Sequence, residues 1–152
     1  MKKFKFKLKA LLSYREHIEK VAKEEVAKVQ VEINRCRESI KELENRFRLT
    51  SIDVEEKMAD GISAQKHVIY SDYLKSLKMK VADENTLLEQ LKVILKNKQE
   101  ELTKKSVSRK ILENLKEKKK QEYYDDIDKQ TMKEADEMVL ISRSFNDKTD
   151  NS

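Results

Sequence analysis

Apolar residues recur along most of the chain in alternating steps of three and four. This spacing predicts amphipathic α-helices that pair through a heptad seam. In the first half the predicted seam runs through Phe4, Leu8, Leu11, Arg15, Ile18, Ala22, Val26, Val29, Ile33, Cys36, Ile40, Leu43, Phe47, Thr50 and Val54. Two steps of four adjoin at Ile18, Ala22 and Val26, which predicts a stutter that locally unwinds the supercoil.

The extreme N-terminus carries a competing pattern, because lysines alternate with Phe4, Phe6 and Leu8 over residues 3–9. A period of two is typical of a β-strand, but the sequence offers no second strand to pair with it. We therefore expect a basic helical end, with a first helix near residues 4–58.

The break between the two helical patterns lies at residues 59–63. Gly61 can adopt the left-handed conformation that ends a helix, and Ser63 can cap the next one. A second helix is predicted near residues 64–145, and the polar segment 146–152 is predicted to be a disordered tail. The second seam runs through Leu74, Leu77, Val81, Glu84, Leu88, Leu91, Leu95, Lys98 and Leu102, then frays through Val107, Ile111, Leu115, Tyr123, Ile127, Ala135 and Val139.

Two long helices joined by a short link must pack antiparallel. The predicted fold is therefore all-α, a single two-helix antiparallel coiled coil, or long α-hairpin, over residues 1–145. In this arrangement residue i faces roughly residue 123 minus i. Glu84 and Lys98 place polar groups in an otherwise apolar seam.

Composition supports this fold and excludes several classes of function. About half of the residues are Lys, Arg, Glu, Leu or Ala, with one Gly and no Pro, as is typical of long helices. Phosphate-binding loops need several glycines, and a lone Cys36 makes neither a disulfide nor a zinc site. No apolar run has the length of a signal peptide or membrane span. We expect a cytoplasmic protein with no cofactor and no metal.

No group of residues suggests catalysis. His17 and His67 are far apart in the predicted hairpin, and Cys36 falls at a seam position. The carboxylates are interleaved with lysines, as on the exposed faces of a coiled coil. Acid–base catalysis needs groups that converge in a cleft, and two helices do not enclose one. The sequence therefore predicts a protein that is not an enzyme.

The charges are unevenly distributed. Residues 1–20 contain seven Lys or Arg against two Glu, and residues 104–120 contain eight against two. Antiparallel pairing lays these segments, together called the basic pole, side by side. Residues 122–137 then carry seven carboxylates against two lysines. The basic pole is either a solvated surface or a binding site for an anionic partner, which could be nucleic acid, an anionic membrane surface or an acidic protein. No motif for specific nucleic-acid recognition is present.

A second candidate surface lies near the predicted turn. Ile69, Tyr73 and Leu87 fall on one shoulder of the seam, so the apolar stripe is wider than a two-stranded coil requires. This stripe is either a docking site or apolar surface used in wrapping the hairpin tip or in self-association.

Several segments resemble the FliJ family of flagellar export proteins. The N-terminal pattern Phe4-x-Phe6-x-Leu8-x-x-Leu11-Leu12-x-x-Arg15 is similar to the opening of that family. Gly61-Ile62 followed by Tyr70-x-x-Tyr73-Leu74-x-x-Leu77 resembles its turn and early second helix. The run LKEKKKQEYY and the segment Gln130-x-x-x-Glu134-x-Asp136-Glu137 resemble its later portion.

The resemblance implies a non-enzymatic stalk of the flagellar type III export apparatus, built like the coiled-coil shaft of rotary ATPases. Its implied partners are the hexameric export ATPase, the membrane export gate and export chaperones, with a peripheral location at the cytoplasmic membrane. The family's gate-contacting stripe early in the second helix would match Tyr73 and Leu77, and we expect Ile69 beside them to contribute. The charge pattern adds Lys7, Arg15, Lys116 and Lys119 as candidate ATPase contacts.

Three other classes of protein share these features. A purely structural coiled coil would self-associate through its heptads and bind neither ATPase nor gate. A stalk protein of a virulence type III secretion system would have the same architecture. A basic coiled-coil adaptor would bind nucleic acid or make weak contact with anionic membrane, and its binding would fall steeply with salt.

Overall fold

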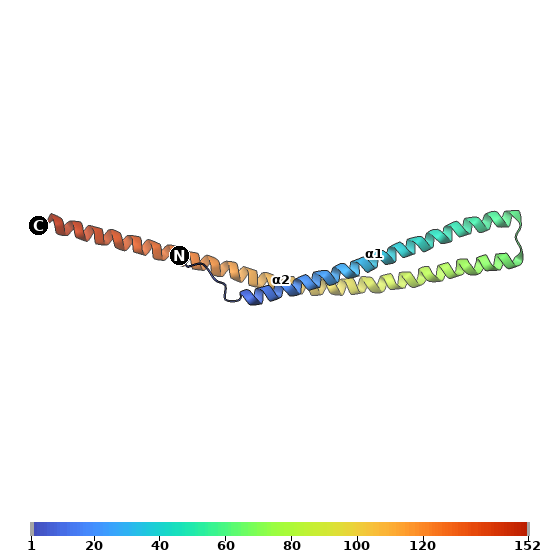
Figure 1. Cartoon of the computed structure of the whole chain (residues 1–152), viewed down its shortest axis with the longest axis horizontal. Helices are drawn as coiled ribbons and strands as arrows, with labels where there is room; N and C mark the ends of the chain where they lie inside the picture. Colours follow the sequence, from blue (N-terminus) through green and yellow to red (C-terminus); the bar gives the residue numbers. More distant parts are fainter. Residues whose placement is uncertain (1, 152) are drawn as a thin grey trace. The chain divides into compact units, whose positions relative to one another are not determined.

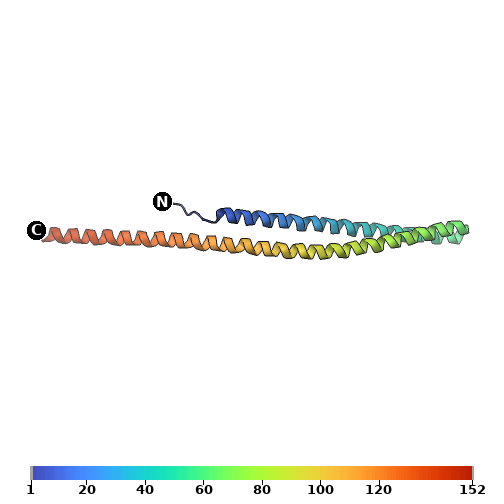
Figure 2. The ribbon, with the colours of Figure 1, turned by 90° about the horizontal axis from the view of Figure 1, so that it is seen from below.

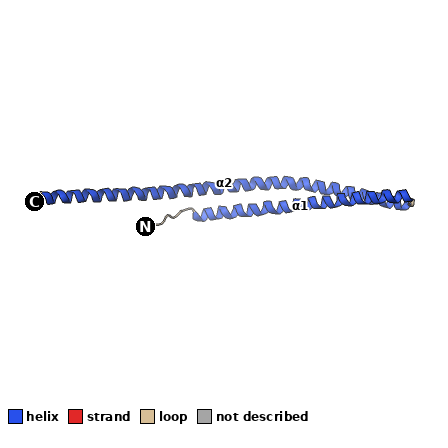
Figure 3. Ribbon diagram, turned by 90° about the horizontal axis from the view of Figure 1, so that it is seen from above, coloured by secondary structure: helices blue, strands red, loops and turns tan. Residues whose placement is uncertain are grey.

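The computed structural model describes residues 2–151, which are helical except for residues 2–8, the turn at 61–63 and residue 151 (Figures 1 and 3). Helix α1 spans Lys9–Asp60 and helix α2 spans Ala64–Asp150, and the described residues contain no strand. The predicted all-α antiparallel coiled coil is thus confirmed. Met1 and Ser152, which belong to the predicted hairpin and tail, lie outside the described residues.

The chain forms two compact units. The hairpin unit comprises Ile18–Lys105, and the terminal unit combines the residues up to His17 with those from Ser106 onward. Within the hairpin unit, α1 and α2 lie side by side and are joined by the turn (Figures 1 and 2).

The turn has the chemistry that the sequence predicts. Gly61 has a φ of 87°, and its amide donates a hydrogen bond to the Met58 carbonyl oxygen at 3.2 Å. The Ser63 hydroxyl oxygen accepts a hydrogen bond from the Lys66 amide at 3.3 Å. Gly61 therefore ends α1 in the left-handed conformation, and Ser63 caps α2.

The core of the hairpin unit is the predicted seam. Val29, Ile33, Cys36 and Leu91 form a buried cluster. Every residue of the second predicted seam, from Leu74 to Leu102, is buried or half-buried. Cross-helix contacts confirm the pairing: Lys98 Nζ lies 3.1 Å from Glu25 Oε2, close to the expected relation between residue i and residue 123 minus i.

The first part of the α1 seam differs from the prediction. Leu12 and Glu19 are buried, whereas Leu11 is exposed and Ile18 only half-buried. The observed path through Leu12, Arg15, Glu19 and Ala22 keeps steps of three and four, so the predicted stutter is absent. The helix keeps one register although this places a carboxylate in the seam, and Lys23 lies 3.0 Å from the Glu19 carboxylate.

The α2 seam likewise continues where fraying was predicted. Lys105, Arg109 and Leu112 continue its spacing and are buried or half-buried, while Val107 and Ile111 are exposed. The long aliphatic stems of Lys and Arg can occupy such positions with their charged ends in water. In this part of α2, unbroken spacing of three and four therefore predicts which residues are buried better than their apolar character does.

The helix ends also differ from the predicted bounds. Residues 4–8 are not helical, so the expected basic helical end is wrong. At the other end α2 continues to Asp150 instead of ending near residue 145. Residues 146–150 contain neither Gly nor Pro, and the Thr149 hydroxyl donates hydrogen bonds back to the carbonyl oxygens of Phe145 and Asn146.

Candidate protein-binding surfaces

The N-terminal segment, residues 2–8, is held against α2 within the terminal unit by Tyr123. The Tyr123 hydroxyl donates a hydrogen bond to the Lys2 carbonyl oxygen at 2.7 Å. The Tyr123 ring lies 5.7 Å from the Phe4 ring, centroid to centroid, and 5.5 Å from the Tyr124 ring. Aromatic packing and this hydrogen bond hold residues 4–7 outside the helix, and the Leu8 carbonyl oxygen accepts the first hydrogen bond of α1 from the Leu12 amide at 2.9 Å.

Burial alternates along this segment. Phe4 and Phe6 are half-buried, whereas Lys3, Lys5 and Lys7 are exposed. The period-two pattern in the sequence therefore corresponds to a non-helical segment whose aromatic residues lie on one side. It pairs with a helix, not with a second strand.

An apolar groove lies between the N-terminal segment and α2. Its apolar lining comes from Phe4, Phe6, Leu8, Leu115 and Tyr123. Three cationic residues complete the lining, namely Lys5, Lys7 and Lys119. We call this feature the N-terminal groove.

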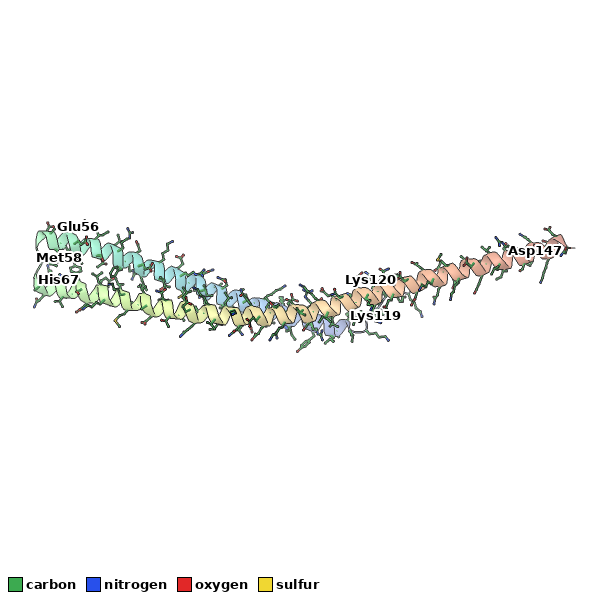
Figure 4. All side chains as sticks on the ribbon, turned by 180° about the vertical axis from the view of Figure 1, so that it is seen from behind. Glu56, Met58, His67, Lys119, Lys120 and Asp147 are labelled. Atoms are coloured by element: carbon green, nitrogen blue, oxygen red, sulfur yellow. The ribbon has the colours of Figure 1, made fainter. Side chains whose placement is uncertain are left out.

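The four candidate ATPase contacts occupy different places in the terminal unit. Lys7 and Lys119 line the N-terminal groove, and Lys116 is exposed on α2. Figure 4 shows Lys119 beside Lys120 on α2. Arg15 is half-buried, and its guanidinium donates a hydrogen bond to the Ser108 carbonyl oxygen at 2.8 Å. Arg15 therefore fastens α1 to α2 and is not part of the groove.

Phe6, Leu115 and Tyr123 line the groove but were not predicted as site residues. The alternation of Phe and Lys was the available signal for Phe6. Tyr123 could not be recognised from spacing, because its partner Lys2 is distant in sequence and interacts through its backbone.

The terminal unit keeps a cationic excess in this region. Residues 2–17 contain six Lys or Arg against one Glu, and residues 106–120 contain six against two. Lys119 pairs with Glu122 at 3.5 Å, and Arg109 pairs with Glu113. The Lys119–Glu122 pair is exposed, and exposed pairs are weak and are screened by salt. The excess of lysines in the region therefore remains attractive to anions.

Farther along α2, residues 128–150 are exposed on all sides. They include Met138, Ile141 and Phe145, which line a shallow apolar depression on one helix face. The sequence analysis did not single out this depression.

The turn-proximal residues divide into surface and core. Ile69 and Tyr73 are 66% and 43% exposed, whereas Leu77 is 1% exposed. Leu77 therefore packs in the seam, and only Ile69 and Tyr73 offer apolar surface to a partner. Met58 and His67 flank the same turn (Figure 4).

A polar cluster supports this end of the hairpin unit. Lys57 Nζ donates a hydrogen bond to the Tyr70 hydroxyl at 2.6 Å and lies 3.2 Å from the Asp53 carboxylate. The hydrogen bond to Tyr70, followed by the one to Asp53, raises the pKa of Lys57. This cation therefore stays charged and joins the end of α1 to the start of α2.

Across residues 2–151, no group of three or more His, Cys, Asp or Glu side chains is placed to hold a metal ion. No helix in that range is long and apolar enough to cross a membrane.

Comparison with known proteins gives one family. Residues 4–148 match the family model described as "Flagellar FliJ protein", which covers nearly the whole chain. Searches of curated proteins and of solved structures find no significant match.

Proposed function

This chain belongs to the FliJ family and is therefore a component of the flagellar type III export apparatus, and from that premise we propose that it links the hexameric export ATPase to the membrane export gate. The family itself is non-enzymatic. The chain would work in the cytoplasm, peripherally at the membrane of the flagellar base, and would assist export chaperones, flagellum assembly and motility.

The ATPase contact is assigned to the basic pole. The observation that carries this assignment is the cationic excess of residues 2–17 and 106–120 in one compact unit. Lys7, Lys116 and Lys119 are its exposed candidate contacts, while Arg15 holds the two helices together. Opposite charge on a partner would speed association and relieve repulsion within the pole.

The gate contact is assigned to the turn end of the hairpin unit. Ile69 and Tyr73 present apolar surface there, and buried Leu77 supports the backbone beneath them. This division of roles follows the observed burial: a partner can contact the first two residues without opening the seam.

The ATPase assignment is tested by reversing charge. The variant Lys7→Glu/Lys116→Glu/Lys119→Glu should bind the export ATPase more slowly and stimulate it less, most clearly at low salt. A matched control, Lys75→Glu/Lys80→Glu/Lys96→Glu, makes the same charge change at exposed positions of the hairpin unit. The control should bind like the parent. If the Lys7/Lys116/Lys119 variant also binds like the parent at low ionic strength, the assignment is wrong.

A further inference from the structure

The N-terminal groove has the properties of a peptide-binding site. Its apolar residues come from two directions, the N-terminal segment and α2. Phe4 and Phe6 are only half-buried, so part of each ring still contacts water. A large apolar side chain placed in the groove would cover this remaining surface.

The backbone of the N-terminal segment adds a second feature. The carbonyl oxygens of Lys2 and Phe6 accept hydrogen bonds. Residues 3–5, by contrast, make no backbone hydrogen bond within the described part of the chain. Unpaired groups on an extended segment can bond to an incoming extended peptide. The groove is thus bordered by both apolar surface and backbone donors and acceptors.

The charge of the groove selects the ligand. Lys5, Lys7 and Lys119 line it, and it contains no carboxylate. Within residues 2–151, Lys5 and Lys7 form no ion pair, and Lys119 pairs only with exposed Glu122. An acidic ligand would therefore be favoured and a basic one repelled.

The geometry favours a protein segment over nucleic acid or lipid. The Phe4 ring packs on Tyr123 at an angle of 52°, which leaves no free face between the two rings for a stacked base. Insertion into a membrane would require the aromatic residues to leave α2 and break the bond between Tyr123 and Lys2.

We propose that the N-terminal groove binds an extended acidic protein segment that carries an aromatic side chain. The aromatic side chain fills the space between Phe6 and Leu115, and the acidic residues face Lys5, Lys7 and Lys119. We assign this segment to the export ATPase, and that assignment, unlike the chemistry of the groove, rests on the proposed function.

The first test uses the full chain and a fluorescent peptide of alternating Glu and Phe. The peptide should bind, while a Glu/Ser peptide and a Lys/Phe peptide should bind at least about tenfold more weakly. Phe6→Ala should weaken binding about tenfold at every salt concentration, because it removes apolar contact. Lys7→Glu should weaken it chiefly at low salt.

Tyr123→Phe provides a second variant with little risk of unfolding. It removes only the hydroxyl that holds Lys2 and should lower affinity by loosening the segment. The matched control, Tyr124→Phe, removes the hydroxyl of the exposed neighbouring residue and should bind like the parent. Circular dichroism of each variant should match the parent.

Three results would overturn the inference. One is equal binding of the Glu/Phe and Glu/Ser peptides, and another is unchanged peptide binding by Phe6→Ala. The third is displacement of the peptide by phosphatidylglycerol vesicles at lower concentration than by unlabelled peptide. If Phe6→Ala binds the ATPase normally but the triple Lys variant does not, the groove assignment fails while the proposed function stands.

Discussion

The thiol of Cys36 on α1 shares its one proton between two oxygens of Glu84 on α2, the carbonyl at 3.2 Å and the carboxylate at 3.3 Å. This contact puts a polar pair beside the apolar cluster of the hairpin unit. Burial, the hydrogen bond to Glu84 and its negative charge all raise the pKa of Cys36. The thiol is therefore held in its neutral form.

A pH dependence follows from this shift. The folded chain keeps the Cys36 proton above the ordinary thiol pKa of 9.0, whereas the unfolded chain loses it near that value. The folded state then binds more protons, so its free energy of unfolding falls as pH rises past 9.0. Cys36→Ala should be less stable than the parent at every pH, because it loses buried contacts. In thermal melts the difference between the two proteins should stay constant below pH 9.0 and shrink above it. Equal pH profiles would contradict the prediction.

The seam can be tested at Leu91, which is buried against Val29, Ile33 and Cys36. Leu91→Asp should lower the free energy of unfolding by at least about 3 kcal/mol, because it buries a charge and removes apolar contact. Urea denaturation followed by circular dichroism measures the loss. Val93→Asp, at an exposed position two residues away, should change stability by much less.

The corrected register of α1 makes a paired prediction. Leu12 is 5% exposed and Leu11 is 38% exposed. Leu12→Ala should therefore cost about 2–4 kcal/mol, and Leu11→Ala less than about 1 kcal/mol. Thermal unfolding of the two variants decides between the observed register and the one with a stutter, which predicts the opposite order.

The proposed gate contact is best tested at its exposed residues. Tyr73→Ala and Ile69→Ala should reduce motility and gate binding while thermal stability and ATPase binding stay near the parent values. Leu77→Ala serves as the structural control, because truncating a fully buried Leu costs about 2–5 kcal/mol. Loss of gate binding only in the destabilised Leu77 variant would remove Ile69 and Tyr73 from the proposal.

The sequence predicted the hairpin well because its second seam has a regular spacing of large apolar residues. Between Leu74 and Leu102, the apolar residues on either side assigned polar Glu84 and Lys98 to the predicted seam. The structure places both residues there. Near residue 18, the search for apolar residues at this spacing assigned Ile18, and not Glu19, to the seam. The helix instead maintained its spacing, because a shift of register would disturb every later layer of the seam.

The groove was the least predictable feature. Its form depends on a contact between Tyr123 and the Lys2 backbone, which leaves no side-chain pattern in the sequence. The charged candidates Lys7 and Lys119 were recognisable by charge density, but nothing in the spacing indicated that they share a groove. Tertiary contact overrode the helical preference of residues 4–8.

The left-handed conformation of Gly61 also lets both helices of the pair come from one molecule. Gly61 is the only residue with positive φ among residues 2–151, and a Cβ added there would meet nothing within 4 Å. A substitution would thus be opposed by backbone strain and not by crowding. Relief of that strain would favour joining α1 and α2 into one continuous helix. Each seam would then be completed by a second chain, in a domain-swapped dimer that buries the same residues.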